Sequence, residues 1–162
     1  MVLPNLAGLL VLAAGTVFMF LVTPWERIKE LFWFGLVGGL VVALVLIYLL
    51  QEVLGFWLFQ RADLLAVQGV PLLLAAGWIP VVIAYGHLLA QYRSWAQVVL
   101  IMLTFPAVAT VIHVAMLANN MLFYANWTLP MTFGLSLAIH LALAAYLYLA
   151  GRLDNLKETV RT

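Results

Sequence analysis

The amino-acid sequence predicts an all-α integral membrane protein, a transmembrane bundle of five helices. Hydrophobic residues make up 67% of the 162 residues and charged residues only 8%, whereas soluble domains are about 45–50% apolar and about 25% charged. The apolar residues form long runs that are separated by brief polar breaks. Each run is long enough to cross a hydrocarbon core, which is about 30 Å thick and needs about 20 residues of helix.

The runs give the expected order of the helices within one domain, residues 1–162. The spans are predicted at residues 2–22, 31–54, 64–90, 96–117 and 129–150, with a short cytoplasmic tail at residues 151–162. The polar breaks are too short to hold a second domain, so nearly the whole chain is expected in or beside lipid.

Residues near the second run predict where that helix begins and where it breaks. Thr23 is the expected N-cap, followed by Pro24 at the first helical position and Glu26 in the first turn, because these residue types suit helix starts. A helix from Pro24 toward Phe59 would be about 54 Å long at 1.5 Å per residue. That length exceeds the bilayer, so a tilt or break is expected near Gly55.

One acidic residue and three prolines mark the third and fourth helices. Asp63 is a candidate cap for the third helix. Pro71 and Pro80 in the third run and Pro106 in the fourth predict kinks. Membrane helices tolerate such kinks because neighbouring groups satisfy the freed backbone carbonyls.

The basic residues predict the orientation in the membrane. In a five-span arrangement Arg61 lies on one side and the other Lys and Arg residues lie on the opposite side. The latter are Arg27, Lys29, Arg93, Arg152, Lys157 and Arg161. Basic loops stay in the cytoplasm, so the N-terminus is predicted outside and the C-terminus inside a cell membrane.

Two sets of small residues predict close helix packing. Gly35, Gly38 and Gly39 lie in the second span, and Ala138 and Ala142 lie four residues apart in the fifth. Small residues let helix backbones approach closely, and packing drives helix association in lipid. Packing within the bundle is the favoured interpretation. The alternative is a surface that docks a second copy or another subunit.

The candidate functional residues are polar side chains inside or beside the spans. They are Glu52 in the second span, His113 in the fourth, His140 in the fifth, and Asn119 and Asn120 just after the fourth. Polar groups in a bilayer are costly and are therefore functional hypotheses. A Glu52–His113 pair could relay protons or hold a polar ligand. An interhelical hydrogen bond that only fixes packing is the favoured alternative.

No cofactor can be assigned, and haem or metal is not supported. Counting from the span ends puts His113 and His140 about 10 Å apart along the membrane normal, whereas bis-histidine ligation needs imidazoles on facing helices at one depth. Cysteine is absent, which excludes thiolate ligands and disulfides. A net charge of +1 with scattered basic residues argues against a nucleic-acid partner.

Four short segments resemble a known family. They are Pro24 with the basic helix after it, Glu52 to Gly55, Pro71 in the third span, and Tyr124 to Trp127. In these segments the chain resembles small five-span integral membrane proteins of spore-forming Gram-positive bacteria, a family with no assigned activity. The resemblance implies a five-span fold in the bacterial plasma membrane. The chain departs from the family at His113, where an acidic residue is expected.

The sequence leaves two functional classes open. The favoured class is a non-enzymatic membrane subunit or assembly factor that acts through helix–helix contacts, because polar groups are scarce and loops are minimal. The alternative is a protein that handles a small molecule, a lipid or protons at an intramembrane site around Glu52 and His113. An enzyme is less favoured than either. The expected partners are the lipid bilayer and a homo-oligomer or a larger membrane complex.

Overall fold

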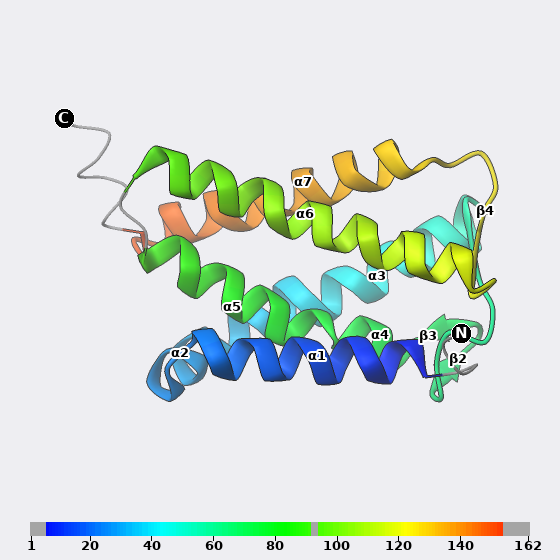
Figure 1. The fold of residues 1–162 in the computed structure, drawn as a ribbon, viewed down its shortest axis with the longest axis horizontal. Coiled ribbons are helices and arrows are strands. Elements are labelled where there is room, and N and C mark those ends of the chain that lie inside the picture. Colours follow the sequence, from blue (N-terminus) through cyan, green and yellow to red (C-terminus); the bar gives the residue numbers. More distant parts are fainter. Residues whose placement is uncertain (1–5, 92–93, 154–162) are drawn as a thin grey trace.

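The computed structural model describes residues 6–91 and 94–153, which form a bundle of helices with short strands at one end (Figure 1). The elements in chain order are α1 (Ala7–Val22), α2 (Trp25–Gly35), η1 (Leu36–Val41), α3 (Val42–Tyr48), η2 (Leu49–Val53), β1 (Trp57–Phe59), β2 (Ala66–Val67), β3 (Val70–Pro71), α4 (Leu72–Ala76), α5 (Trp78–Gln91), α6 (Trp95–Ala118), β4 (Leu122–Tyr124) and α7 (Leu129–Leu149). The segments η1 and η2 are π-helical turns within one continuous helix.

Four helices of the described chain are long and apolar enough to cross a membrane. They are Trp25–Val53, Leu72–Gln91, Trp95–Ala118 and Leu129–Leu149. The helical class and four of the predicted apolar helices are therefore confirmed. The helix α1 has 16 residues, about 24 Å at 1.5 Å per residue. A crossing by α1, and hence a fifth span, stays a prediction.

The second helix begins and ends differently from its prediction. Thr23 is not its N-cap; Pro24 holds that position without a side-chain hydrogen bond. Thr23 instead ends α1, with its backbone N–H bonded to the carbonyl oxygen of Met19. The helix stops at Val53, because Gly55 adopts a φ of +64°, a left-handed conformation that glycine reaches without a Cβ penalty.

The third run does not become helical at residue 64. Residues Ala66–Val67 and Val70–Pro71 pair as a short antiparallel hairpin, and α4 begins only at Leu72. Pro71 therefore precedes the helix and does not kink it. Asp63 still serves the helix start, because its carboxylate accepts hydrogen bonds from the backbone N–H groups of Leu74 (2.8 Å) and Leu65 (3.2 Å).

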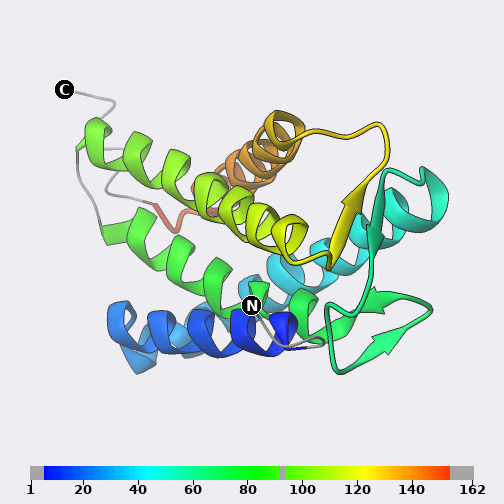
Figure 2. The same ribbon diagram turned by 45° about the vertical axis from the view of Figure 1, so that its right-hand side comes forward.

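A second pair of strands ties two helix ends together. Strand β1 follows the second helix, β4 follows α6, and the two pair antiparallel with Leu58 opposite Phe123. Figure 2 shows this ladder at the end of the bundle where the β2–β3 hairpin also lies. The ladder brings Trp57 and Tyr124 opposite each other, and this positions both beside the cavity described below.

Close contacts of glycine determine how the helices pack. The helix α5 packs against α1, α2 and η1, while α6 packs along α7. A Cβ on Gly39 would lie 2.6 Å from the carbonyl oxygen of Trp78, and one on Gly35 would lie 2.4 Å from Ile83. Only glycine allows this approach of α2 and η1 to α5. Ala138 and Ala142, by contrast, are exposed on α7.

Candidate ligand-binding cavity

A cavity of about 90 Å³ lies inside the bundle. Its walls come from η1 and α3 on one side and from α6 and α7 on the other, with residues of α4 and α5 between them. Trp57 and Phe59 of β1 line it at the strand end of the bundle. By comparison, a void of about 150 Å³ accepts benzene, so this cavity is smaller than a benzene site and suits a few waters or a smaller group.

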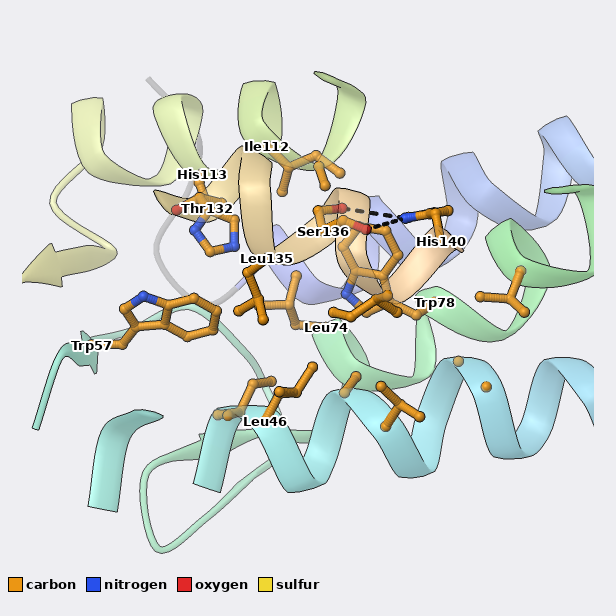
Figure 3. Close-up of a pocket in the computed structure, with 18 of the residues that line it drawn as sticks. Leu46, Trp57, Leu74, Trp78, Ile112, His113, Thr132, Leu135, Ser136 and His140 are labelled. Carbon is orange, nitrogen blue, oxygen red and sulfur yellow. Dashed lines mark hydrogen bonds between the residues drawn. The ribbon is translucent and has the colours of Figure 1, made fainter. Parts of the chain in front are cut away.

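The polar lining residues lie on one wall of the cavity. Thr132, Ser136 and His140 are spaced by four residues on α7, so they share one helix face, and His113 joins them from α6. Figure 3 shows these four side chains along the upper side, with Leu46 of α3 on the opposite, apolar side. All four polar residues are buried. The cavity is therefore amphipathic across its width.

His140 has a defined tautomer because of its hydrogen bond along α7. Its Nδ1 lies 2.7 Å from the carbonyl oxygen of Ser136 and 3.4 Å from the Ser136 hydroxyl (Figure 3). A carbonyl oxygen can only accept, so Nδ1 carries the proton and donates. The neutral ring then presents Nε2 as an acceptor. Within residues 6–91 and 94–153 this Nε2 is buried and has no hydrogen-bond partner.

His113 belongs to a hydrogen-bond chain that reaches the loop before α7. Its Nδ1 lies 2.6 Å from the hydroxyl of Tyr124, which lies 2.7 Å from the hydroxyl of Thr132. Trp127 donates from Nε1 to the same Thr132 oxygen at 2.9 Å, and Thr132 is 3.3 Å from the carbonyl oxygen of Thr128. The chain fixes the orientation of His113 at the cavity.

This chain allows two arrangements of protons. Tyr124 can donate to His113 and accept from Thr132, or it can accept from His113 and donate to Thr132. His113 thus has two neutral tautomers available. When Thr132 donates to Tyr124, its single hydroxyl proton leaves the carbonyl oxygen of Thr128, so one tautomer costs that bond. Burial raises the pKa of the Tyr124 phenol, and the bond to Thr132 partly opposes this, so Tyr124 keeps its proton at neutral pH.

The partly exposed lining residues show where the cavity opens. Val42 and Leu46 on α3 and Leu135, Ile139 and Leu143 on α7 are each half-buried. All five are apolar, and their partial exposure on α3 and α7 indicates that the cavity opens between these two helices. An apolar opening between two helices of membrane-spanning length leads to lipid more readily than to water.

The remaining predicted site residues lie apart from the cavity. Glu52 is exposed, and its carboxylate accepts a hydrogen bond from Nε2 of Gln51 at 2.8 Å. Asn119 donates from Nδ2 to the carbonyl oxygen of Ala115, and Asn120 adopts a φ of +55° after the helix. Of the five residues predicted for a ligand or proton site, only His113 and His140 line the cavity. Glu52 and His113 therefore do not meet there.

The sequence analysis did not single out several residues of this site. Tyr124 and Trp57 lie in short strands, and no sequence pattern marked strands in a chain this apolar. The spacing in the sequence could have identified Thr132 and Ser136, because with His140 they repeat every four residues and so share one helix face. Among the described residues no group of three or more His, Cys, Asp or Glu side chains could hold a metal ion.

The fold and the cavity define a helical protein with an internal, partly open and mostly apolar cavity. The chain matches no protein-family model, no curated protein and no solved structure. The resemblance to five-span proteins of spore-forming bacteria therefore stays a prediction.

Proposed function

We propose that this protein binds a small, mostly apolar molecule in the cavity between α3 and α7, as a carrier or sensor in the bacterial plasma membrane. In this proposal α1 supplies a fifth span, the N-terminus lies outside and the C-terminus lies in the cytoplasm. The observation that carries the proposal is the amphipathic lining. A mostly apolar cavity with a few convergent polar groups is the usual form of a small-molecule site.

The sequence predicted such a site as its alternative function but placed it around Glu52 and His113, and of these two only His113 lines the cavity. The site consists of His113 and His140 with Thr132 and Ser136, and Glu52 is not part of it. All four polar side chains make hydrogen bonds to backbone or neighbouring side chains. Preorganised side chains of this kind reduce the entropy cost of binding. Nδ1 of His140 lies 3.4 Å from the Ser136 hydroxyl but carries the proton that it donates to the Ser136 carbonyl oxygen. It cannot act as a base toward that hydroxyl, so binding is favoured over catalysis at this cavity.

A membrane subunit remains the second candidate because one face of α7 is free of internal packing. Gly134, Ala138 and Ala142 are exposed and repeat every four residues, and a Cβ on Gly134 would meet nothing within 4 Å. Such a stripe suits close approach of another helix. Replacing Ala138 with Trp would block that approach, and the mass of the protein in nanodiscs would report any lost oligomer or partner.

The experiment for ligand binding fills the cavity and compares a neighbouring position. Leu46 lines the cavity, whereas Val45 on the same helix is 50% exposed and faces outward. The variant Leu46→Trp adds an indole on the cavity side of α3, and Val45→Trp adds the same side chain on its outer side. After purification from its native membrane, the wild type should release a small molecule on denaturation, detected by mass spectrometry.

We expect Val45→Trp to retain that molecule and Leu46→Trp to lose most of it. Circular dichroism and size-exclusion chromatography in detergent would establish that both variants fold. Equal retention by two folded variants would refute binding in this cavity. Absence of any cavity-dependent molecule would leave the subunit as the better candidate.

A further inference from the structure

The hydrogen bonds of Thr132 determine where each proton lies in the chain that ends at His113. The indole N–H of Trp127 can only donate to the Thr132 hydroxyl, and the carbonyl oxygen of Thr128 can only accept from it. The single Thr132 proton therefore goes to Thr128. The Thr132 oxygen accepts from Trp127 and, at 2.7 Å, from Tyr124. The Tyr124 proton is then committed to Thr132, so Nδ1 of His113 must donate to the Tyr124 oxygen at 2.6 Å. This order makes all four bonds at once, which no other arrangement of the protons does.

The proton order leaves His113 with a hydrogen-bond acceptor that is open to the cavity. With the proton on Nδ1, Nε2 of the neutral ring carries a lone pair. His113 lines the cavity, and Figure 3 shows its ring pointing into it. Within residues 6–91 and 94–153, Nε2 of His113 makes no hydrogen bond, yet it is not one of the enclosed atoms without a partner, as Nε2 of His140 is. Nε2 of His113 therefore keeps accessible surface and can receive a donor.

The polar side chains that α7 places on the cavity wall are already occupied. The Thr132 oxygen accepts two hydrogen bonds, and its proton is used. His140 donates from Nδ1 to the carbonyl oxygen of Ser136, lies 3.4 Å from the Ser136 hydroxyl, and has an enclosed Nε2. A water in a cavity needs about two to four polar partners. The cavity therefore favours a molecule with one donor and an apolar body over a cluster of waters.

The volume and the charge of the cavity limit the molecule further. The volume of about 90 Å³ is roughly the liquid volume of three waters, so about three non-hydrogen atoms fit. Among the described residues that line the cavity, none is Asp, Glu, Lys or Arg, so a charged group would be buried without a counter-ion at high cost. The partly exposed lining residues of α3 and α7 are apolar. A small uncharged molecule that dissolves in lipid satisfies these conditions.

We propose that the cavity binds an uncharged hydrogen-bond donor of about three non-hydrogen atoms, of the class of short-chain alcohols, which donates to Nε2 of His113. Thr132 is the positioning residue that determines this preference, because its bond to Thr128 keeps the proton of His113 off Nε2. This inference rests on the proposed function and names the class of ligand. The body of the ligand lies against the apolar wall, which includes Leu46 of α3. A molecule that only accepts hydrogen bonds finds no donor at His113 and binds more weakly.

The experiment compares ethanol with dimethyl ether, two molecules of the same atomic composition of which only ethanol donates a hydrogen bond. Nitrogen-15 NMR of the full-length protein, labelled in histidine and placed in nanodiscs, reports the protonation and hydrogen bonding of each ring nitrogen. The His113 signals are those that are missing from the variant His113→Gln. The concentration of each probe is scaled by its measured partition into protein-free nanodiscs. Leu46→Trp fills the cavity, and Val45→Trp is the matched control because Val45 is 50% exposed.

We expect the ligand-free wild type to carry the His113 proton on Nδ1. Ethanol should shift the Nε2 signal in a saturable way, whereas dimethyl ether should leave that signal in place and displace ethanol only at a bilayer concentration about tenfold higher. The ethanol shift should persist in Val45→Trp and vanish in Leu46→Trp. In Thr132→Val the Tyr124 proton loses its acceptor and turns to Nδ1 of His113, so Nε2 becomes the protonated nitrogen. Dimethyl ether should then bind as tightly as ethanol.

Two further variants separate the role of Thr132 from a general loss of packing. Thr132→Ser keeps the hydroxyl, and Thr110→Val removes a hydroxyl of α6 that donates to the carbonyl oxygen of Pro106; both should keep the wild-type proton order. A ligand-free wild type with the proton on Nε2, or equal shifts of Nε2 by the two probes, overturns the proposal whether or not Thr132→Val folds. If neither probe acts, this inference fails alone when Leu46→Trp still loses the native molecule. The proposed function fails with it when Leu46→Trp and Val45→Trp retain that molecule equally.

Discussion

The hydroxyl of Tyr85 on α5 donates a hydrogen bond to the backbone carbonyl oxygen of His140 on α7, with 2.7 Å between the oxygens. Tyr85 is fully buried. The bond connects the helices that pack around α5 with the α6–α7 pair. It also holds the backbone of α7 at the residue whose side chain lines the cavity. The contact therefore contributes both to stability and to the position of the candidate site.

Replacing Tyr85 with Phe should destabilise the protein by about 0.6–1.7 kcal/mol, the range for interhelical hydrogen bonds in membranes. Equilibrium unfolding in mixed micelles would measure this free energy. The matched control is Tyr48→Phe, because Tyr48 is 51% exposed on α3. Removing the Tyr48 hydroxyl should change the free energy of unfolding by less than removing the Tyr85 hydroxyl. Equal effects of the two substitutions would contradict a structural role for the Tyr85 bond.

The protein should lose stability at alkaline pH, where the buried phenol of Tyr124 ionises. Burial raises the pKa of Tyr124 above its ordinary value of 10 in the folded protein. The folded state thus holds the proton more tightly than the unfolded state does. This contribution to stability is complete below about pH 10 and is lost as the pH rises through the folded pKa.

Wild type should therefore lose more stability than Tyr124→Phe as the pH rises above about 10. At neutral pH Tyr124→Phe should be the less stable of the two proteins, because it lacks the bridge between His113 and Thr132. That bridge is worth about 1–2 kcal/mol. Thermal unfolding across this pH range would measure both effects. Parallel pH profiles for the two proteins would show that Tyr124 does not titrate in this way.

The helices could be predicted from sequence because lipid imposes a length and an apolar composition on each of them. The predicted runs at residues 96–117 and 129–150 match α6 and α7 within one residue at each end. The start of the third helix could not be predicted by the same rule. Residues 64–71 are as apolar as a span, yet they form a hairpin between Asp63 and α4.

The residues of the site could be predicted only where the residue type alone indicates a functional role. A histidine inside a span is costly, and this reasoning identified His113 and His140. Glu52 follows the same rule, but the helix ends one residue later and leaves its carboxylate exposed. The pairing of β1 with β4 brings Trp57 and Tyr124 to the site. That pairing joins segments more than 60 residues apart, and no local pattern in one sequence records it.

Gly39 should tolerate no side chain, whereas Gly134 should accept one. A Cβ on Gly39 would lie 2.6 Å from the carbonyl oxygen of Trp78, a backbone atom that cannot move aside alone. Gly39→Ala is expected to cost about 1–3 kcal/mol through overpacking. Gly134→Ala should cost nothing or stabilise slightly, because alanine favours helix. Unfolding free energies of the two variants would measure the contrast, and similar values would refute the close approach of η1 to α5.

The orientation can be tested with single cysteines, since the chain has none of its own. Gln60 and Glu26 are exposed and lie at opposite ends of the second helix, Glu26 in its first turn and Gln60 after its last residue. Intact cells treated with a membrane-impermeant maleimide should label Gln60→Cys, and Glu26→Cys should react only after permeabilisation. The reverse pattern would contradict an N-terminus outside, and reaction of both in sealed cells would contradict a crossing by this helix.

A third cysteine at Leu6 tests whether α1 is a fifth span. The backbone N–H of Gly8 donates to the carbonyl oxygen of Ala62 at 3.0 Å, so the start of α1 lies at the same end of the bundle as Gln60. The end of α1 leads through Thr23 and Pro24 into the first turn of α2, which holds Glu26. If α1 crosses, Leu6→Cys must label like Gln60→Cys and unlike Glu26→Cys. Labelling of Leu6→Cys only after permeabilisation would leave four spans and place both ends of α1 on the cytoplasmic side.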